Sequence, residues 1–326
     1  MNASKRGSLI RSPMQRWFPL FVLPTFLCFI IGFVWPFIQG IYLSFCDFNI
    51  PKDAQWVGKE LFEEAMQDPA FAGNLFEKIS YAISISFKNY QKAFADPSFA
   101  RAFWNTASFA VVSIIAINVL AFSIAYALTQ KMKGSNLFRT VFFMPNLIGG
   151  VVLGYIWSMI FDGVLRAYST YLTADPRLGF WGLVILVAWQ QIGYMMIIYI
   201  AGLQAVSEDM LEAARIDGAN GRQTLFKVVI PNVMPSITIC TFLTLTNSFK
   251  LFDQNMALTG GSPIITQPDG SQIKTTELLA LNIYSTYNIN RRWHGTAQAK
   301  AVIFFILVAV LALAQQYFTR KKEVEQ

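Results

Sequence analysis

Long runs of apolar residues, separated by polar segments, dominate the pattern along this chain of 326 residues. A helix needs roughly 20 mostly apolar residues to cross the hydrocarbon core of a bilayer. Six stretches meet that requirement, over residues 17–45, 103–129, 141–161, 180–203, 233–252 and 299–318. The pattern therefore predicts an all-α, polytopic membrane protein with six transmembrane helices.

The polar segments predict one membrane domain with short tails. The expected parts are a tail at 1–16, the first helix at 17–45, an extracytoplasmic segment at 46–102, a five-helix core at 103–318 containing a long loop at 204–232, and a second tail at 319–326. The first apolar run is longer than the about 7–15 residues of a signal-peptide core, and no small-residue cleavage site follows it. We therefore expect it to remain as an anchor helix.

The distribution of cations predicts the orientation of the helices. Thirteen Lys and Arg residues lie in the first tail, the 130–140 loop, the 204–232 loop and the second tail. Short segments rich in cations stay in the cytoplasm, so both termini are expected there, in a cell (plasma or inner) membrane. The opposite side carries the 46–102 segment, in which Leu61, Phe62, Ala65 and Met66 have the spacing of a short amphipathic helix.

Composition and charge strengthen this prediction. The chain is 54% hydrophobic and 14% charged, whereas a soluble domain carries about 25% charged residues. The net charge of +7 does not indicate nucleic-acid binding, because the cations lie in clusters between apolar runs. Three scattered cysteines exclude a disulfide framework, and the single histidine, His294, lies beside Arg291 and Arg292, so no metal site is expected.

The 204–232 loop is long for a simple connection and has the signals of two helices. Ser207 is a suitable N-cap, followed by two acids that favour a helix N-terminus. Gly218 can adopt positive φ and end this first helix. A second helix is expected over 222–229 and is expected to be broken by Pro231. A structured, weakly charged loop of this kind indicates a docking surface rather than a solvated connection.

Several residues at fixed spacing in this loop resemble a known family. Glu212-Ala213-Ala214, Asp217-Gly218-Ala219, Phe226 and the terminal Ile230-Pro231 are similar to the "EAA" loop of binding-protein-dependent ABC importer permeases. Further matches to its maltose/glycerol-phosphate branch are Asn89-Tyr90, Asp96-Pro97, Asn105-Thr106, the segment 248–253, the segment 258–263 and the segment 295–301. Ser262 stands where that branch often has Gly, and residues 52–80 resemble an insertion.

The resemblance implies a type I importer permease fold with a cytoplasmic coupling helix. It implies a second homologous permease subunit, usually a different chain, together with two cytoplasmic ATPase subunits and an extracytoplasmic solute-binding protein. The coupling contacts it implies are Glu212, Ala213, Ala214, Asp217, Gly218, Ala219 and Pro231. The chain has no phosphate-binding loop motif, so we expect no catalytic residue and no cofactor in it, with ATP and Mg²⁺ bound by the ATPase subunits.

Polar residues inside the apolar stretches are candidates for solute contacts, because such residues are costly in a membrane. The candidates are Gln190, Gln191 and Tyr194 in the fourth stretch, and Asn247 and Ser248 in the fifth. Amides bond sugar hydroxyls, but they also bond neighbouring helices. Lys250 and Asp253 have the spacing of an ion pair. Gly150 and Gly154 either provide a face for close helix packing or reflect the ordinary frequency of glycine in membrane helices.

The function expected from these features is passage of a sugar or oligosaccharide by alternating access. One alternative is an ABC permease for a non-sugar solute. Another is an ion-coupled secondary transporter, which the lack of acids within the second, third, fourth and sixth stretches disfavours. A membrane-embedded enzyme is disfavoured by the single histidine and by the absence of clustered carboxylates.

The orientation can be tested with reporter fusions. Because short cation-rich loops face the cytoplasm, fusions after residues 135 and 220 are expected to report a cytoplasmic position, and fusions after residues 75 and 270 an external one. Alkaline phosphatase and fluorescent-protein reporters give opposite signals at each site, so each fusion controls the other. An external signal at residue 220 contradicts the orientation.

Overall fold

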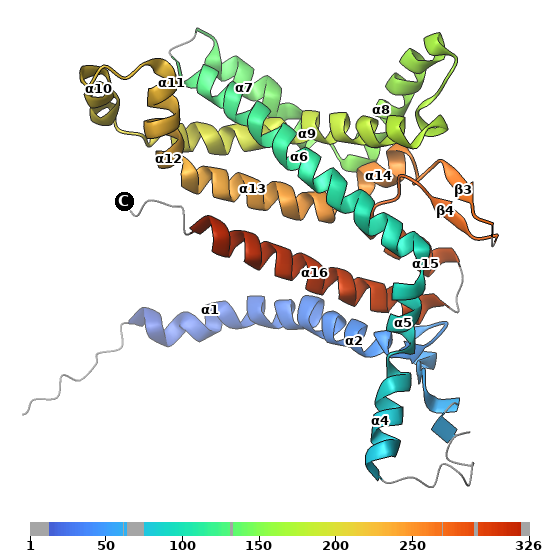
Figure 1. Ribbon diagram of the computed structural model, residues 1–326. Helices are drawn as coiled ribbons and strands as arrows, with labels where there is room; N and C mark the ends of the chain where they lie inside the picture. Colours follow the sequence, from blue (N-terminus) through green and yellow to red (C-terminus); the bar gives the residue numbers. More distant parts are fainter. Residues whose placement is uncertain are drawn as a thin grey trace, which may run out of the picture.

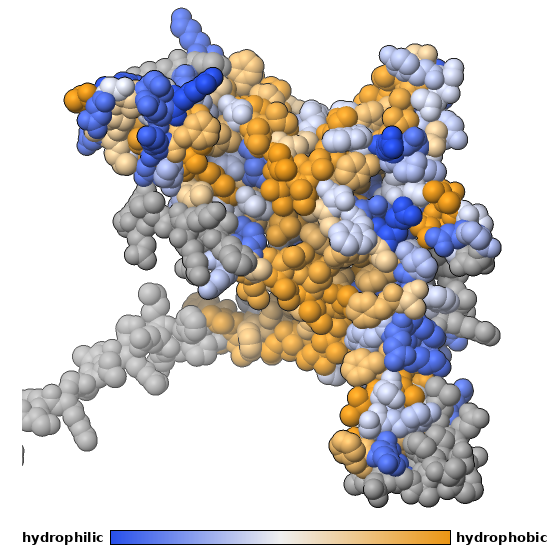
Figure 2. Space-filling model, in the orientation of Figure 1, coloured by the Kyte–Doolittle hydropathy of each residue, from blue (hydrophilic) through white to orange (hydrophobic). Residues whose placement is uncertain are grey.

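The computed structural model describes residues 13–60, 62–63, 75–130, 133–268, 270–289 and 293–320. Long helices run side by side through the molecule, with the loop of α10 (Glu208–Ile216) at one end and the hairpin β3–β4 (Ile264–Thr266 and Gln272–Lys274) at the other (Figure 1). Apolar side chains cover the middle, while hydrophilic residues gather at both ends (Figure 2). This is the surface that a protein surrounded by lipid requires.

Five helices among the described residues are long and apolar enough to span a bilayer, and a bent pair makes six. The first span joins α1 (Pro13–Phe29), a π-helical turn (Ile30–Val34) and α2 (Trp35–Ser44). The others are α6 (Pro97–Thr129), α8 (Gly150–Leu165), α9 (Pro176–Gln204) and α16 (His294–Arg320). The predicted all-α polytopic fold is confirmed.

Pro145 lies inside the third apolar stretch, 141–161, where a proline kinks or ends a helix, and the structure divides the predicted span there. α7 (Ser135–Phe143) ends inside it, a 3₁₀ turn follows over Met144–Leu147, and α8 begins only at Gly150. Pro145 lies in that turn and has no N–H to continue the α-helical pattern, which explains the break.

The bent pair forms the fifth span. α11 (Gly221–Thr224), a π-helical turn (Leu225–Val229) and α12 (Ile230–Asn232) meet α13 (Met234–Phe249) at an angle of 69°. The expected break at Pro231 therefore comes later, after Asn232, because a proline is accommodated in the first turn of α12. Pro235 occupies the first turn of α13 in the same way.

Short elements complete the end opposite α10. They are the antiparallel pair β1 (Cys46–Asp47) and β2 (Gln55–Trp56), a 3₁₀ turn at Pro51–Asp53, α4 (Leu75–Ser86), α5 (Lys88–Ala95), two 3₁₀ turns at Arg166–Tyr168 and Leu172–Ala174, α14 (Asp253–Leu258) and α15 (Leu279–Ile289). In the antiparallel β3–β4 hairpin, Ile265 lies opposite Ile273.

Several expectations lie outside the described residues. They are the amphipathic spacing at Leu61, Ala65 and Met66, and the cations Lys5, Arg6, Arg11, Lys131, Arg291, Arg292, Lys321 and Lys322. Within the described part, the core forms where α6 and α9 pack together with α13. Phe109, Ile117, Leu186, Met195 and Tyr199 are almost fully buried there.

Gly150 and Gly154 form a close-packing face. A Cβ atom on Gly154 would lie 2.5 Å from the Cβ of Ala257, and one on Gly150 would lie 2.8 Å from the Cβ of Asp253. Both glycines therefore let α8 approach α14 at nearly backbone distance. The structure supports the packing interpretation of this pair over ordinary glycine content.

The contact predicts opposite effects of the same substitution at two glycines of α8. Gly154→Ala should destabilise the protein by about 1–3 kcal/mol, because α14 must shift to admit the methyl group. Gly163→Ala is the matched control, since a Cβ atom on Gly163 would meet no other atom within 4 Å. It should gain up to about 1 kcal/mol from helix propensity. Thermal unfolding in detergent measures both, and equal melting temperatures for the two variants contradict the packing.

Candidate functional site

The predicted coupling loop begins with a capped helix. The Ser207 hydroxyl accepts a hydrogen bond from the Met210 N–H at 3.3 Å, which satisfies a free donor at the start of α10. Glu208 and Asp209 lie in the first turn and Arg215 in the last, so all three charges suit the helix dipole. The local sequence therefore favours a helix that starts here.

Gly218 ends α10 in the left-handed conformation that the sequence predicts. Its φ is +76°, its N–H donates to the Arg215 carbonyl at 3.1 Å, and the Ala219 N–H donates to the Ala214 carbonyl at 2.9 Å. This is the double hydrogen bond of a Schellman end. A Cβ on Gly218 would meet no atom within 4 Å, so backbone conformation, rather than space, requires glycine here.

The next helix begins with a reciprocal pair of hydrogen bonds. Asn220 accepts from the Gln223 N–H at 2.9 Å, while the Gln223 side chain accepts from the Asn220 N–H at 2.8 Å. This capping box fixes α11 directly after the Gly218 turn. Two helices with defined ends thus meet at a short turn, which holds the loop in one shape.

The loop presents a mixed polar and apolar outer surface. Glu212, Ala213 and Asp217 are exposed, whereas Ala214 is buried and Ala219 and Pro231 are half-buried. Ile216 and Phe226 expose 85% and 66% of their surface. Ile216 was not among the predicted coupling residues; its only signal was an apolar residue directly before the Asp217-Gly218 turn.

A deep hollow lies beside this loop. It has a volume of about 1020 Å³ and is lined by Glu212, Arg215, Leu211 and the adjoining ends of α6 and α9, including Tyr126 and Gln204. The loop and the ends of two long helices therefore form one continuous surface at this end of the molecule.

A second, polar pocket lies between α9 and the gap that separates α13 from α14. It has a volume of about 280 Å³, and its lining residues are Gln191, Asn247, Lys250, Leu251, Phe252, Asp253 and Gln254. The chain is unwound between Phe249 and Asp253. Unwound backbone within an apolar region is tolerated only where protein or a polar cavity satisfies it.

The pocket unites two of the five predicted solute residues. The Oε1 atom of Gln191 is buried and has no hydrogen-bond partner among the described residues, and Asn247 lines the same cavity. An unpartnered buried acceptor is costly in a folded protein.

The other three predicted residues are placed differently. Gln190 donates to the Ile148 carbonyl at 3.1 Å and accepts from the Gln254 amide at 2.8 Å, so it ties α9 to neighbouring segments. Ser248 is buried and donates to the Thr244 carbonyl of its own helix at 2.7 Å. Tyr194 is 37% exposed and is not among the residues that line this pocket.

Sequence reasoning missed a role for Lys250, Asp253 and Gln254 in this pocket. It had offered Lys250 and Asp253 as an ion pair, but no such pair occurs between them among the residues that the structure describes. The expected pair assumed a continuous helix, in which residues three positions apart lie on one face. The chain is unwound between Phe249 and Asp253, so this spacing does not apply.

The remaining motif residues form a joint at the end opposite α10. Lys300 on α16 is fully buried and donates to Asp96 at 2.6 Å, to Asn282 at 3.0 Å and to Thr286 at 2.7 Å. Burial opposes ionisation of the Asp96 carboxyl, but hydrogen bonds from Lys300 and Ser98 prevail and lower its pKa below the ordinary value.

Amides complete this joint. Asn89 donates to the carbonyls of Ser44 and Cys46, and Asn105 donates to the carbonyls of Thr275 and Glu277. Gly295 lets α16 approach the Cys46 carbonyl so closely that a Cβ atom would clash with it. These motif residues therefore hold segments together rather than facing the pocket.

Comparison with known proteins gives a consistent result. Residues 120–324 match the family model described as "Binding-protein-dependent transport system inner membrane component". A relative from Thermoanaerobacterium thermosulfurigenes, the "Probable starch degradation products transport system permease protein AmyD", is 40% identical over 317 residues, covering 95% of this chain and 96% of the relative. The "Multiple sugar-binding transport system permease protein MsmF" of Streptococcus mutans is 27% identical over 320 residues, covering 94% and 97%.

A solved structure shares the fold. It is titled as a bacterial ABC transporter "involved in the import of the acidic polysaccharide alginate", and its matched chain superposes with a TM-score of 0.69 at 18% identity. The match covers 94% of this chain and 97% of that chain. At this identity the likeness concerns the arrangement of the helices.

Proposed function

Because this chain belongs to the family of binding-protein-dependent transport system inner membrane components, we propose that it carries a sugar or oligosaccharide from an extracytoplasmic binding protein into the cytoplasm. It is a permease subunit, and the energy comes from ATP hydrolysed by partner subunits. The observation that carries the sugar assignment is the 40% identity, over nearly the full length of both chains, to a protein named for starch degradation products.

The pocket between α9 and the α13–α14 gap supports this substrate class. Its amides of Gln191, Asn247 and Gln254 offer both donors and acceptors, as the hydroxyls of a sugar require. Lys250 and Asp253 add charged partners, which make stronger hydrogen bonds. We assign the solute contacts to Gln191 and Asn247, and the positioning of Gln254 to Gln190.

The loop of α10 supports a coupling role. Glu212, Ala213 and Asp217 lie on its exposed surface together with Ile216, and Gly218 and the Asn220 capping box hold this surface in a fixed shape. We propose that a cytoplasmic ATPase subunit receives it, with Ala214, Ala219 and Pro231 shaping the loop from within. The complete assembly contains two ATPase subunits and a second, different permease chain.

The proposal is tested by deleting the gene and measuring uptake of labelled starch-derived oligosaccharides. Uptake should be lost, and it should return when the intact chain is supplied together with its partner subunits. Uptake of a non-sugar solute alone, or uptake driven by an ion gradient in vesicles without ATP, contradicts the proposal in favour of one of the alternative transport classes.

Two substitutions test the solute pocket. Gln191→Ala and Asn247→Ala should each weaken transport at low solute concentration by about 5- to 150-fold, because one lost partner of a buried hydroxyl costs about 1–3 kcal/mol. The readout is the apparent KM for uptake in reconstituted vesicles. Ser123→Ala is the control, since this exposed hydroxyl on α6 bonds only to the Val119 carbonyl among the described contacts.

An unchanged KM for both pocket variants removes the solute from this cavity. In that case Ser248→Ala and Tyr194→Ala become the informative variants, because those residues lie on the same two helices outside the cavity.

A pair of glycine substitutions tests the coupling loop. Gly218→Ala should cost about 1 kcal/mol or more at the α10 turn, since φ there is +76°. Gly221→Ala is the matched control, because a Cβ at either glycine would meet no atom within 4 Å and, of the two, only Gly218 has positive φ. Gly218→Ala should reduce uptake and solute-stimulated ATP hydrolysis, while capture of the solute by the binding protein stays normal.

Glu212→Lys extends this test by reversing a charge on the exposed surface. A positive group of the ATPase subunit that attracts Glu212 would repel the lysine. It should leave membrane insertion intact and abolish solute-stimulated ATP hydrolysis. Wild-type ATP hydrolysis and uptake in both Gly218→Ala and Glu212→Lys would show that this loop does not transmit the motion.

A further inference from the structure

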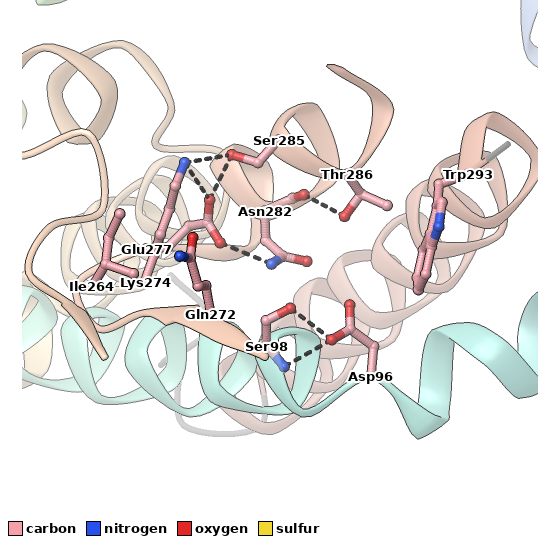
Figure 3. A pocket seen from close by; sticks show the side chains of 10 residues that line it. All are labelled: Asp96, Ser98, Ile264, Gln272, Lys274, Glu277, Asn282, Ser285, Thr286 and Trp293. Carbon is pink, nitrogen blue, oxygen red and sulfur yellow. Dashed lines mark hydrogen bonds and ion pairs between the residues drawn. The ribbon is translucent and has the colours of Figure 1, made fainter. Parts of the chain in front are cut away.

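A separate pocket lies at the end of the molecule opposite α10. It has a volume of about 210 Å³ and is bordered by the β3–β4 hairpin, α15 and the starts of α6 and α16. Figure 3 shows Trp293 at one side, the pair Lys274 and Glu277 at the other, and Asn282 and Thr286 between them. The coupling loop and the α9 pocket contribute no residue to it.

The acidic group of this pocket is buried but retains acceptor capacity. Glu277 is 3% exposed. Its carboxylate accepts from Ser285 at 2.6 Å and from Asn282 at 2.8 Å, and the Lys274 ammonium lies 3.5 Å away. A carboxylate has about four acceptor positions, so these partners leave room for a further donor.

The basic group supplies the complementary donors. The Lys274 ammonium lies 3.1 Å from the Ser285 hydroxyl, and its side chain is 31% exposed. An ammonium has three N–H donors, and exposure leaves some of them accessible from the pocket. A charged donor and a charged acceptor therefore stand side by side.

The Lys274–Glu277 pair is distinct from the joint around Lys300. The three donors of Lys300 are used by Asp96, Asn282 and Thr286. Asn282 connects the two groups, since its oxygen accepts from Lys300 and its nitrogen donates to Glu277. Lys300 thus holds Asn282, and Asn282 in turn holds the Glu277 carboxylate at the cavity.

The pocket also has an aromatic wall. Trp293 is 40% exposed and faces the polar groups across the cavity (Figure 3). A sugar ring has hydroxyls that both donate and accept, and C–H faces that pack on an aromatic ring. Drug-sized ligands occupy cavities of about 300–1,000 Å³. A volume of about 210 Å³ therefore suits one sugar ring better than a longer chain or a peptide segment.

We propose that this outer pocket binds a single sugar unit, with hydroxyls on Lys274 and Glu277 and the ring face on Trp293. The choice of a sugar rests on the proposed transport function. A solute released by the binding protein would then contact the permease here before it reaches the pocket beside α9.

Binding can be measured without the binding protein. The assembled transporter in lipid nanodiscs is titrated with methyl α-glucoside and with maltotriose, and saturation-transfer NMR reports contact and affinity. Trp293→Ala and Glu277→Gln should each weaken binding by about tenfold or more, as expected for loss of a charged or aromatic partner. Trp181→Ala is the control, because Trp181 is similarly exposed, at 54%, on α9 and does not line this cavity.

The outcomes separate this inference from the transport function. Asn247→Ala should impair uptake but retain binding that depends on Trp293. Should Glu277→Gln fail to fold, Trp293→Ala decides alone, because its ring is partly exposed. Normal sugar uptake with no binding, or with binding unaffected by both variants, refutes the outer site and leaves the transport function standing. Absence of both uptake and binding refutes both proposals.

Discussion

The buried ammonium of Lys300 is the interaction on which the end of the molecule opposite α10 depends. A charge removed from water is tolerated only when it is paired and its hydrogen bonds are satisfied. Lys300 meets both conditions by joining α16 to Asp96 at the start of α6 and to Asn282 and Thr286 on α15. Removing one partner of such a pair costs about 3–5 kcal/mol. Because of this cost, α6, α15 and α16 are held in one relative arrangement. Their contacts with lipid alone would not fix that arrangement.

Close backbone approach supplies specificity deeper in the molecule. Lipid is as apolar as the helices, so burial of apolar surface alone does not choose helix partners. Gly150 and Gly154 allow α8 to pack closely on α14. Gly193 allows α9 to approach the backbone at the C-terminal end of α7. The amide of Gln190 adds a directional bond to Ile148 and Gln254. Shape and hydrogen bonding together thus specify the packing that hydrophobicity leaves open.

The sequence predicted the fold class and the coupling-loop geometry well, because both follow from local rules. Apolar run length identified the membrane segments, and Ser207 and Gly218 marked the ends of α10. The sequence left open what tertiary contacts decide. Adjacent amides at Gln190 and Gln191 differ by about 100° around the helix; contacts with Ile148 and Gln254 engage Gln190, while Gln191 lines the cavity.

Because the chain is unwound between α13 and α14, the residues of the α9 pocket lie on two segments that different contacts hold in place. α14 packs against α8 through glycine contacts and is bonded to α9 through Gln190. Asn247 instead belongs to α13, which meets the preceding segment at the 69° bend toward the loop. The α9 pocket therefore lies across the boundary between α13 and α14. A small rotation of α13 would change the separation between Asn247 and Gln254 while every helix stays intact, so the proposed solute pocket would widen or narrow without any unfolding.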